Sequence, residues 1–299
     1  MRFGPAVAIA AALSLLAACF APAASGTGTL TPVPLIGGDA RVGGLSGLEV
    51  SETGDRFTAI SDRGYMLTGG IDRDEAGSLR ARIGAIERIR HLDGSEYPAD
   101  RPLIADAEGL ALFPDGRLAI SFEEFHRVFV YQPNGRALRM PFPPKSLNMA
   151  RNNGFEALAV DPEGRLVALP EGGGGDRTAP VMRLMMGGWH VVAEVNRADR
   201  FRPVGADFGP DGLLYLLERK VTPLGFRSRI RRFDLSRPGL LSGETLWAPH
   251  RSFGNLEALS IWTDKTGRLH AMLLADDNYS AFMSGGMYDL PLAAADEAM

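Results

Sequence analysis

The stretch FEALAVDPEG, residues 155–164, joins a short apolar strand to a turn and sets the pattern of the whole chain. Its Pro presets φ at the first turn position, and its Gly takes the position that needs a positive φ, as in tight turns between antiparallel strands. Related phrases recur at residues 45–50, 107–112, 204–208 and 256–261, each followed by a turn and a second apolar strand. The chain is therefore built from five similar units.

The spacing of these units predicts the fold. Gly116, Gly164 and Gly212, which close successive turns, are 48 residues apart, and units of about 40 to 50 residues with four short strands are typical of propeller blades. We expect an all-β protein, a β-propeller of five four-stranded antiparallel blades; a sixth blade would require a degenerate unit within residues 63–106. A β-sandwich is the alternative, but a sandwich does not need one phrase five times. Because the last unit has room for only three strands, we expect residues 29–36 to supply its outer strand.

The first residues have the pattern of an export signal. Arg2 precedes an apolar run over residues 6–18 that is too short to span a bilayer as a helix. The run ends in LAAC, which resembles the lipobox of bacterial lipoproteins and would make Cys19, the only cysteine, a lipidated first residue; plain signal cleavage a few residues later is the alternative. We expect a protein exported to the periplasm or cell envelope, anchored only by lipid. The expected organisation is a signal peptide at 1–18, a linker at 19–27, the propeller at 28–292 and a tail at 293–299.

Composition excludes several classes of function. The net charge is −4 and the isoelectric point is near 5.8, so we expect no binding to nucleic acid. The sequence also lacks a Gly-x-Ser-x-Gly elbow, a P-loop and a Rossmann glycine pattern. We expect a monomer that acts on a small molecule.

Acidic residues recur at two places in the repeat, where the first strand begins and where the second strand ends. In a propeller both places lie on the same face of the disc, so the side chains should gather at one end of the central channel. Carboxylates that converge in this way repel one another, and Ca²⁺, which accepts about six to eight oxygen ligands in loose geometry, would compensate the repulsion. Pairing with arginine is the alternative explanation. The candidate metal ligands are Asp62, Glu108, Glu123, Glu156, Glu171, Glu218, Glu257 and Asp276.

Other side chains near these acids are candidates for catalysis and substrate binding. Glu156 and Glu171 are candidate catalytic carboxylates, and His126 is either a general acid or an ordinary surface histidine. Four polar residues are candidates for holding the substrate and neutralising its charge: Arg63, Arg127, Arg219 and Asn153.

Several phrases, read in order, resemble one known family. GLSGLE at residues 44–49, AISDRG at 59–64, DAEGL at 106–110 and NNGFEAL at 152–158 are similar to the phytase-like family, described as having esterase-like activity of phytase. The resemblance covers about residues 40–290. It implies a propeller fold, hydrolysis of phosphate or carboxylate esters, and calcium by analogy with propeller phytases. Ser46 and Val204 stand where other units carry Glu, which departs from a complete ring of acids.

Three functions therefore compete. The first is a calcium-dependent phosphoesterase, in which the arginines neutralise developing charge. The second is a lactonase or carboxylesterase with one calcium ion and a carboxylate base. The third is a non-catalytic propeller that binds a ligand or protein at the cell envelope, because a fold alone does not decide a function.

Overall fold

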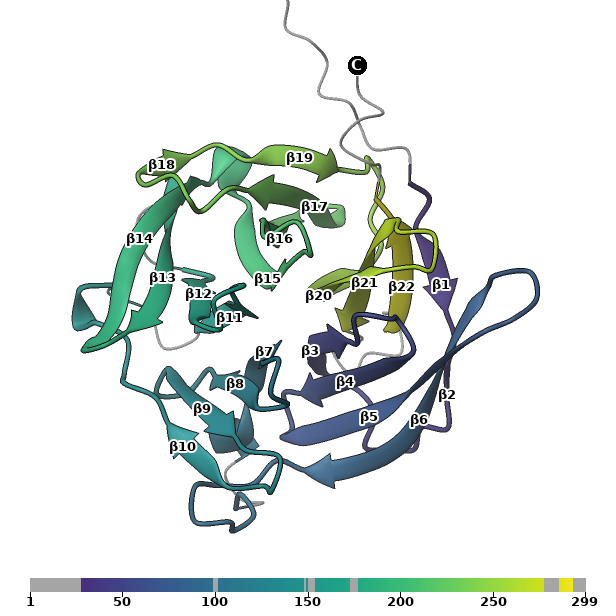
Figure 1. Cartoon of the computed structure of the whole chain (residues 1–299), viewed down its shortest axis with the longest axis horizontal. Coiled ribbons are helices and arrows are strands. Elements are labelled where there is room, and N and C mark those ends of the chain that lie inside the picture. Colours follow the sequence, from purple (N-terminus) through teal and green to yellow (C-terminus); the bar gives the residue numbers. More distant parts are fainter. Residues whose placement is uncertain are drawn as a thin grey trace, which may run out of the picture.

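Five separate β-sheets surround a central axis (Figure 1), so the protein is an all-β, five-bladed propeller as the repeat predicted. The structure, a computed structural model, describes residues 28–98, 102–147, 149, 154–172, 177–276 and 285–292. The signal peptide, Cys19, the linker and the tail lie outside the described residues, so their expected roles stay predictions. In the described ranges, no helix is long and apolar enough to span a membrane.

Each blade begins with an inner strand, and its first four strands, counted outward from the axis, pair antiparallel. Blade 1 contains β3 (Leu45–Val50), β4 (Arg56–Ser61), β5 (Tyr65–Arg73), β6 (Leu79–Arg88) and β2 (Leu35–Ile36). Blade 2 contains β7 (Ala107–Leu112), β8 (Leu118–Phe122), β9 (Arg127–Tyr131) and β10 (Ala137–Arg139). Blade 3 contains β11 (Phe155–Val160), β12 (Leu166–Pro170), β13 (Thr178–Met185), β14 (Gly188–Asn196) and β18 (Leu240–Leu241). Blade 4 contains β15 (Arg202–Phe208), β16 (Leu214–Thr222), β17 (Gly225–Phe233) and β19 (Glu244–Trp247). Blade 5 contains β20 (Asn255–Thr263), β21 (Leu269–Asp276), β22 (Gly286–Pro291) and β1 (Thr31–Val33). Three short 3₁₀ helices connect blades: η1 (Pro102–Ala105), η2 (Lys145–Leu147) and η3 (Ala198–Arg200).

The N-terminal segment closes the ring. Thr31 of β1 pairs with Asp289 of β22, so the outer strand of the last blade does come from the predicted segment 29–36, through its residues Thr31–Val33. The segment then crosses to the neighbouring blade, where Leu35 of β2 pairs in parallel with Ala81 of β6. Two blades are thereby tied together by one short stretch of chain, and the edge of β22 is covered.

The long first interval does not contain a sixth blade. Its extra length goes into β5 and β6, a hairpin of 9- and 10-residue strands that extends from the rim at the right of Figure 1. Blades 1 and 3 also differ from the expected four strands, because β2 and β18 each add a fifth strand in parallel.

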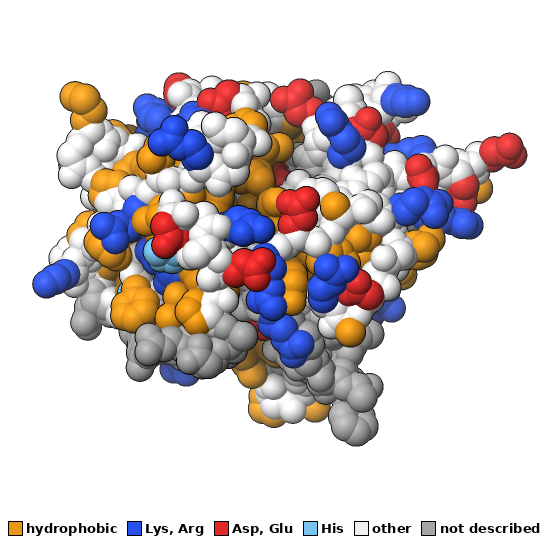
Figure 2. All heavy atoms as spheres, turned by 90° about the horizontal axis from the view of Figure 1, so that it is seen from below, with side chains coloured by type: hydrophobic (Ala, Val, Ile, Leu, Met, Phe, Trp, Pro, Cys, Tyr) orange, Lys and Arg blue, Asp and Glu red, His pale blue; other side chains and the backbone are white. Residues whose placement is uncertain are grey.

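Small residues let the inner strands approach one another around the axis. A Cβ atom added at Gly109 would lie 2.8 Å from the carbonyl oxygen of Glu156, and one added at Gly47 would lie 2.8 Å from Cβ of Leu110. Larger residues fill the spaces between blades, and Trp262, which is 1% exposed, packs with Leu48 and Phe57 between blades 5 and 1. The rim is different: Figure 2, an edge-on view, shows acidic and basic side chains interspersed over it.

Candidate active site

A β-bulge near the start of every inner strand positions the site. The register of β3 against β4 shifts between Leu45 and Gly47, and a corresponding shift occurs in β7, β11, β15 and β20. A bulge leaves a residue out of the ladder and re-aims its side chain. The residues at these bulges are those that the repeat placed at the strand starts, Ser46, Glu108, Glu156, Val204 and Glu257.

Four of these five residues, all but Val204, line a pocket of about 380 Å³ at one end of the axis. Seven of the eight acids predicted to gather there line it, together with one further carboxylate and a single arginine. The lining residues are Gly44, Ser46, Asp62, Asp106, Glu108, Glu123, Glu156, Glu171, Arg219, Glu257 and Asp276. Beneath the pocket the space around the axis contracts to about 10 Å³, lined by residues that include Gly47, Gly109, Gly205 and Ala258. That is room for about one water molecule.

Three carboxylates in blade 2 come together most closely. Oxygen atoms of Asp106, Glu108 and Glu123 all lie within 4.8 Å of one another, and all three side chains are partly buried. The backbone N–H of Glu123 donates to the carbonyl oxygen of Asp106 over 3.0 Å, which fixes the ends of the two strands beside each other. This set of hard oxygen donors suits a divalent cation such as Ca²⁺.

The pKa values of these carboxyl groups show how strongly the pocket disfavours negative charge. Burial raises the pKa of Asp106 to about 7, and the neighbouring charges of Glu123 and Asp62 add to the shift. Burial also raises the pKa of Glu108 and of Glu156 well above the ordinary value, with the nearest acids contributing to both shifts. A bound cation would reverse this penalty at Asp106 and Glu108 by replacing the protons that these two groups otherwise hold. The residues present therefore fit a calcium ion.

Asp106 is the one acid of the pocket that we did not predict as a ligand. It precedes the inner strand of blade 2 by one residue, and the corresponding residues in blades 1 and 3 are Gly44 and Gly154. The repeat therefore offers no matching acid at this position. The only available signal was its place in the DAEGL phrase, two residues before Glu108.

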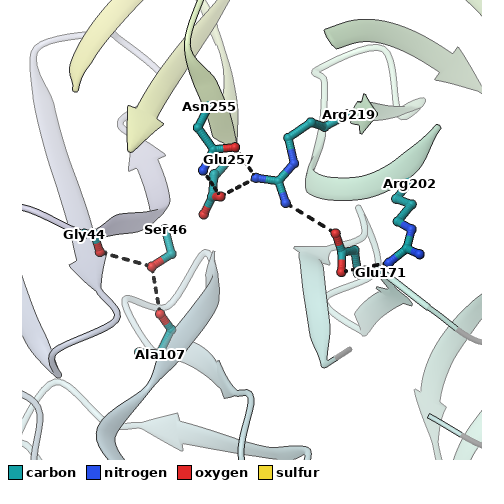
Figure 3. A network of polar contacts seen from close by, with 8 residues as sticks. All are labelled: Gly44, Ser46, Ala107, Glu171, Arg202, Arg219, Asn255 and Glu257. Carbon is teal, nitrogen blue, oxygen red and sulfur yellow. Dashed lines mark hydrogen bonds and ion pairs between the residues drawn. The ribbon is translucent and has the colours of Figure 1, made fainter. Parts of the chain in front are cut away.

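The opposite side of the pocket is neutralised by Arg219. Its guanidinium binds Glu257 and the side-chain oxygen of Asn255, and it lies 3.3 Å from an oxygen of Glu171 (Figure 3). The other oxygen of Glu171 lies 3.4 Å from Arg202. Arg219, predicted to contact substrate, therefore lies in the pocket, but it also pairs with two of the predicted metal ligands.

Glu218 is the predicted ligand that the structure corrects. Its side chain is fully buried between Arg229, at 2.7 Å, and Arg231, at 2.5 Å, and does not line the pocket. The reason is register. In blade 4, Arg202 pairs with Arg219, and in blade 2 the residue pair at the same place is Asp106 with Glu123. Arg219 is thus the counterpart of Glu123, and Glu218, one residue away, points to the other face of its sheet.

Two of the predicted substrate-binding arginines also lie elsewhere. The guanidinium of Arg127 donates to the carbonyl oxygens of Glu124 and Ile104 and stacks 4.6 Å from the ring centroid of Phe122, so it holds blade 2 to the preceding loop. Arg63 is exposed beside β4 and is not among the described residues that line the pocket.

The remaining two predicted site residues do not contribute to the described pocket. His126 lies in the turn between β8 and β9 with φ of 42° and is not among the pocket-lining residues. Asn153 lies outside the described residues.

Solved structures similar to this one share its architecture at low sequence identity. The PQQ-bound aldose sugar dehydrogenase from Streptomyces coelicolor is 12% identical with a TM-score of 0.52, covering 90% of this chain and 99% of that one. The allergen Mala s 1 from Malassezia sympodialis is also 12% identical with a TM-score of 0.50, covering 85% and 79%. Likeness at this level shows the propeller fold alone.

Comparison with curated proteins finds no match. The sequence pattern of a family, in contrast, matches residues 40–279, which run from before β3 to just beyond β21 and include the described residues that line the carboxylate pocket. That family is described as phytase-like, with esterase-like activity of phytase. This chain is therefore a member of the phytase-like family.

Proposed function

We propose that the protein is a calcium-dependent hydrolase of ester bonds and that the reaction takes place in the carboxylate pocket. The observation that carries the proposal is the group formed by Asp106, Glu108 and Glu123, whose oxygens lie within 4.8 Å of one another. Membership of a family described by esterase-like activity supports the same reaction class.

When bound, calcium would polarise the ester and lower the pKa of an attacking water. The chain's own residues would position the substrate and move protons. Glu156 lies outside the close group of Asp106, Glu108 and Glu123, and burial raises its pKa, so this carboxyl group can carry a proton and deliver it to the oxygen of the departing alcohol. Arg219 can donate hydrogen bonds to negative charge that develops on the reacting group.

Glu171 serves this arrangement by holding Arg219. Because its two oxygens face Arg219 and Arg202 separately, it restricts the rotation of both guanidinium groups. We infer that Glu171 is a positioning residue, in place of the catalytic role first expected for it. Water and the ester would yield an acid and an alcohol, with the proton balance closed by the pocket carboxyl groups.

Arg63 and Arg127 do not line the pocket, and this bears on which type of ester the protein hydrolyses. A phosphomonoester brings about two negative charges at neutral pH, and Arg219 is the sole basic side chain among the described residues that line this pocket. A carboxylic ester or lactone brings no charge at the reacting group. The arrangement therefore favours a carboxylic ester or lactone over a phosphomonoester.

Calorimetric titration with calcium tests the metal site directly. The wild type should release or absorb heat with a defined stoichiometry, and Glu108→Gln, which keeps the side-chain volume but removes a charged ligand, should bind at least about tenfold more weakly. Asp115→Asn is the matched control, because Asp115 lies in the turn at the other end of the β7–β8 hairpin and contacts Arg117. Absence of binding heat in the wild type would remove the metal from the proposal.

Activity is tested on two chromogenic substrates, 4-nitrophenyl butyrate and 4-nitrophenyl phosphate, with calcium and after removal of calcium. We expect calcium-dependent hydrolysis of the butyrate ester with little release of phosphate. Faster phosphate release than butyrate hydrolysis would show that the phosphoesterase alternative is correct. If the protein cleaves neither of these esters and none of a broader ester panel, the remaining candidate is the non-catalytic binding function.

A further inference from the structure

We propose that a second, basic pocket beside the carboxylate pocket is an anion-binding subsite, and that the ester cleaved by this protein carries a separate anionic group. The inference rests on the proposed hydrolase function for the identity of the ligand, but the subsite itself is defined by its own geometry. It lies at the junction of η3, β15 and β16.

The composition of this second pocket is the reverse of the first. The cavity is about 390 Å³ and is lined by four basic side chains, two acidic ones and a valine: Arg200, Arg202, Arg219, Lys220, Glu171, Asp199 and Val221. One of the two acids, Glu171, is already engaged by Arg202 and Arg219. The remaining positive charge favours an anionic ligand.

The two pockets share a wall. Glu171 and Arg219 line both of them, and Figure 3 shows Arg219 reaching from Glu257 to Glu171, with Arg202 beyond. A molecule that spans this wall would place its ester among the carboxylates and its anionic group among the basic side chains. Two cavities of similar size, about 380 and 390 Å³, suit a small molecule with two functional ends.

The strand pairing at this wall brings two like charges together, which does not stabilise the sheet. Arg202 lies directly opposite Arg219 on antiparallel strands, and like charges in that position destabilise a sheet. Arg219 pairs with Glu257 as well as with Glu171, so Arg202 has only a share of Glu171 as its counter-charge. An anion bound beside Arg202 would give this arginine a counter-charge of its own.

The helix η3 supplies a further basic side chain, Arg200, from a strained backbone conformation. Asp199 and Arg200 have φ of 60° and 61°, a left-handed conformation that residues other than glycine rarely adopt and that tends to persist where function requires it. This conformation places the exposed Arg200 on the lining of the basic pocket. Lys220 completes the set from β16, with its ammonium 4.7 Å from the ring centroid of Phe201.

Guanidinium groups offer paired donors to planar or tetrahedral oxyanions. The chemical group that this pocket would recognise is therefore a carboxylate, sulfate or phosphate on the substrate, distinct from the bond that is cleaved. The substrate class that follows is an anionic ester, such as the half-ester of a dicarboxylic acid.

Sulfate is the probe for the subsite, titrated calorimetrically into metal-stripped protein at constant ionic strength. Arg200→Gly should weaken sulfate binding about tenfold, since it removes a charged donor, while the melting temperature stays the same or rises because glycine tolerates the left-handed φ. Asp199→Gly relieves the same kind of strain but retains every cation, so sulfate affinity should hold or increase. Arg56→Gln, at the exposed first residue of β4, removes an equal charge elsewhere and should leave the affinity unchanged.

The outcome that overturns the subsite is equal sulfate affinity in the wild type and Arg200→Gly, or no detectable binding in the wild type. A second comparison addresses the substrate, using the 4-nitrophenyl esters of succinic and butyric acid, which differ by one carboxylate. Arg200→Gly should raise KM for the succinate ester about tenfold and leave KM for the butyrate ester unchanged. If neither ester is hydrolysed but sulfate binding still depends on Arg200, the hydrolase proposal fails and the subsite stands.

Discussion

Blades 2 and 4 have the same architecture at the pocket but opposite chemistry. Blade 2 presents Asp106, Glu108 and Glu123, whereas the register of blade 4 places Arg202, Val204 and Arg219 at the corresponding positions. In blade 2 the carboxylates face one another and their pKa values rise. In blade 4 the arginines pair with acids of other blades. One repeated set of backbone positions thus carries a group of carboxylates in blade 2 and two arginines in blade 4.

The same contrast separates acids that pair with arginine from acids that lie among other acids. Glu218 is buried with two arginines, while Glu108 is surrounded chiefly by other acids. Replacing each with glutamine should therefore have opposite consequences for the protein without calcium.

The largest effect is expected for Glu218→Gln. It leaves Arg229 and Arg231 buried without their shared counter-charge, and breaking a buried ion pair in this way costs about 3–5 kcal/mol. Urea unfolding of the variant and of Glu108→Gln, both without calcium, measures the difference. Glu108→Gln should lose far less stability or gain some, because it removes repulsion. Equal losses would contradict the contrast between paired and unpaired acids.

The stability of the calcium-free protein should fall as pH rises from about 4 to about 7. The pKa of Asp106 is raised to about 7 from 3.8, so over this range the folded state retains a proton that the unfolded state has released. At about 1.4 kcal/mol per pKa unit, the loss from the titration of Asp106 is at most about 4 kcal/mol. Free energies of unfolding measured at several pH values test this. Asp106→Asn should flatten the profile, and a profile as steep as that of the wild type would exclude Asp106 as the source.

Calcium should stabilise the wild type by about 2.7 kcal/mol at 100 times its Kd. Thermal unfolding with and without calcium should show that Asp106→Asn removes most of this gain, because the residue belongs to the close carboxylate group of blade 2. Glu257→Gln should retain most of it, since Glu257 is already neutralised by Arg219. A larger loss in Glu257→Gln than in Asp106→Asn would move the ion to the other side of the pocket.

The smallest effect is expected at the far ends of the hairpins. Asp115 lies 2.7 Å from Arg117, and its side chain is 58% exposed, so Asp115→Asn should leave the free energy of unfolding nearly unchanged and should not alter calcium binding. A calcium response in this variant would show that the turn acids contribute to the ion site after all.

Much of the architecture was predictable from local patterns. The FEALAV phrase and the PEG turn specify a hairpin through residue types alone, and their recurrence indicated five blades. The bulge residues Glu108, Glu156 and Glu257 could be located because each occupies the same place in its unit. The outer strand of the last blade was likewise predicted, since a sheet edge there would otherwise stay open.

The wrong predictions for Glu218 and Arg127 both came from treating nearness in the sequence as nearness in space. Glu218 and Arg219 are adjacent in sequence, and only the pairing of Arg202 with Arg219 shows which of the two faces the pocket. Arg127 was chosen for its nearness to Glu123 and Glu124, but it extends to the carbonyl oxygen of Ile104, 23 residues earlier in the chain. A one-residue change of phase reverses the face on which a strand side chain lies.

Residue types and their spacing were enough to predict the repeating strands, the glycine turns and the placement of most acids at one end of each hairpin, because these depend on φ preferences and on alternation along a strand. Which charges meet depends on how the blades pack. Arg219 joins Glu171 and Glu257, which are 48 and 38 residues away, only after the blades close into a ring. The physical reason is that burial and Coulomb interactions depend on distances in space, so the division into a carboxylate pocket and a basic pocket exists only in the folded ring.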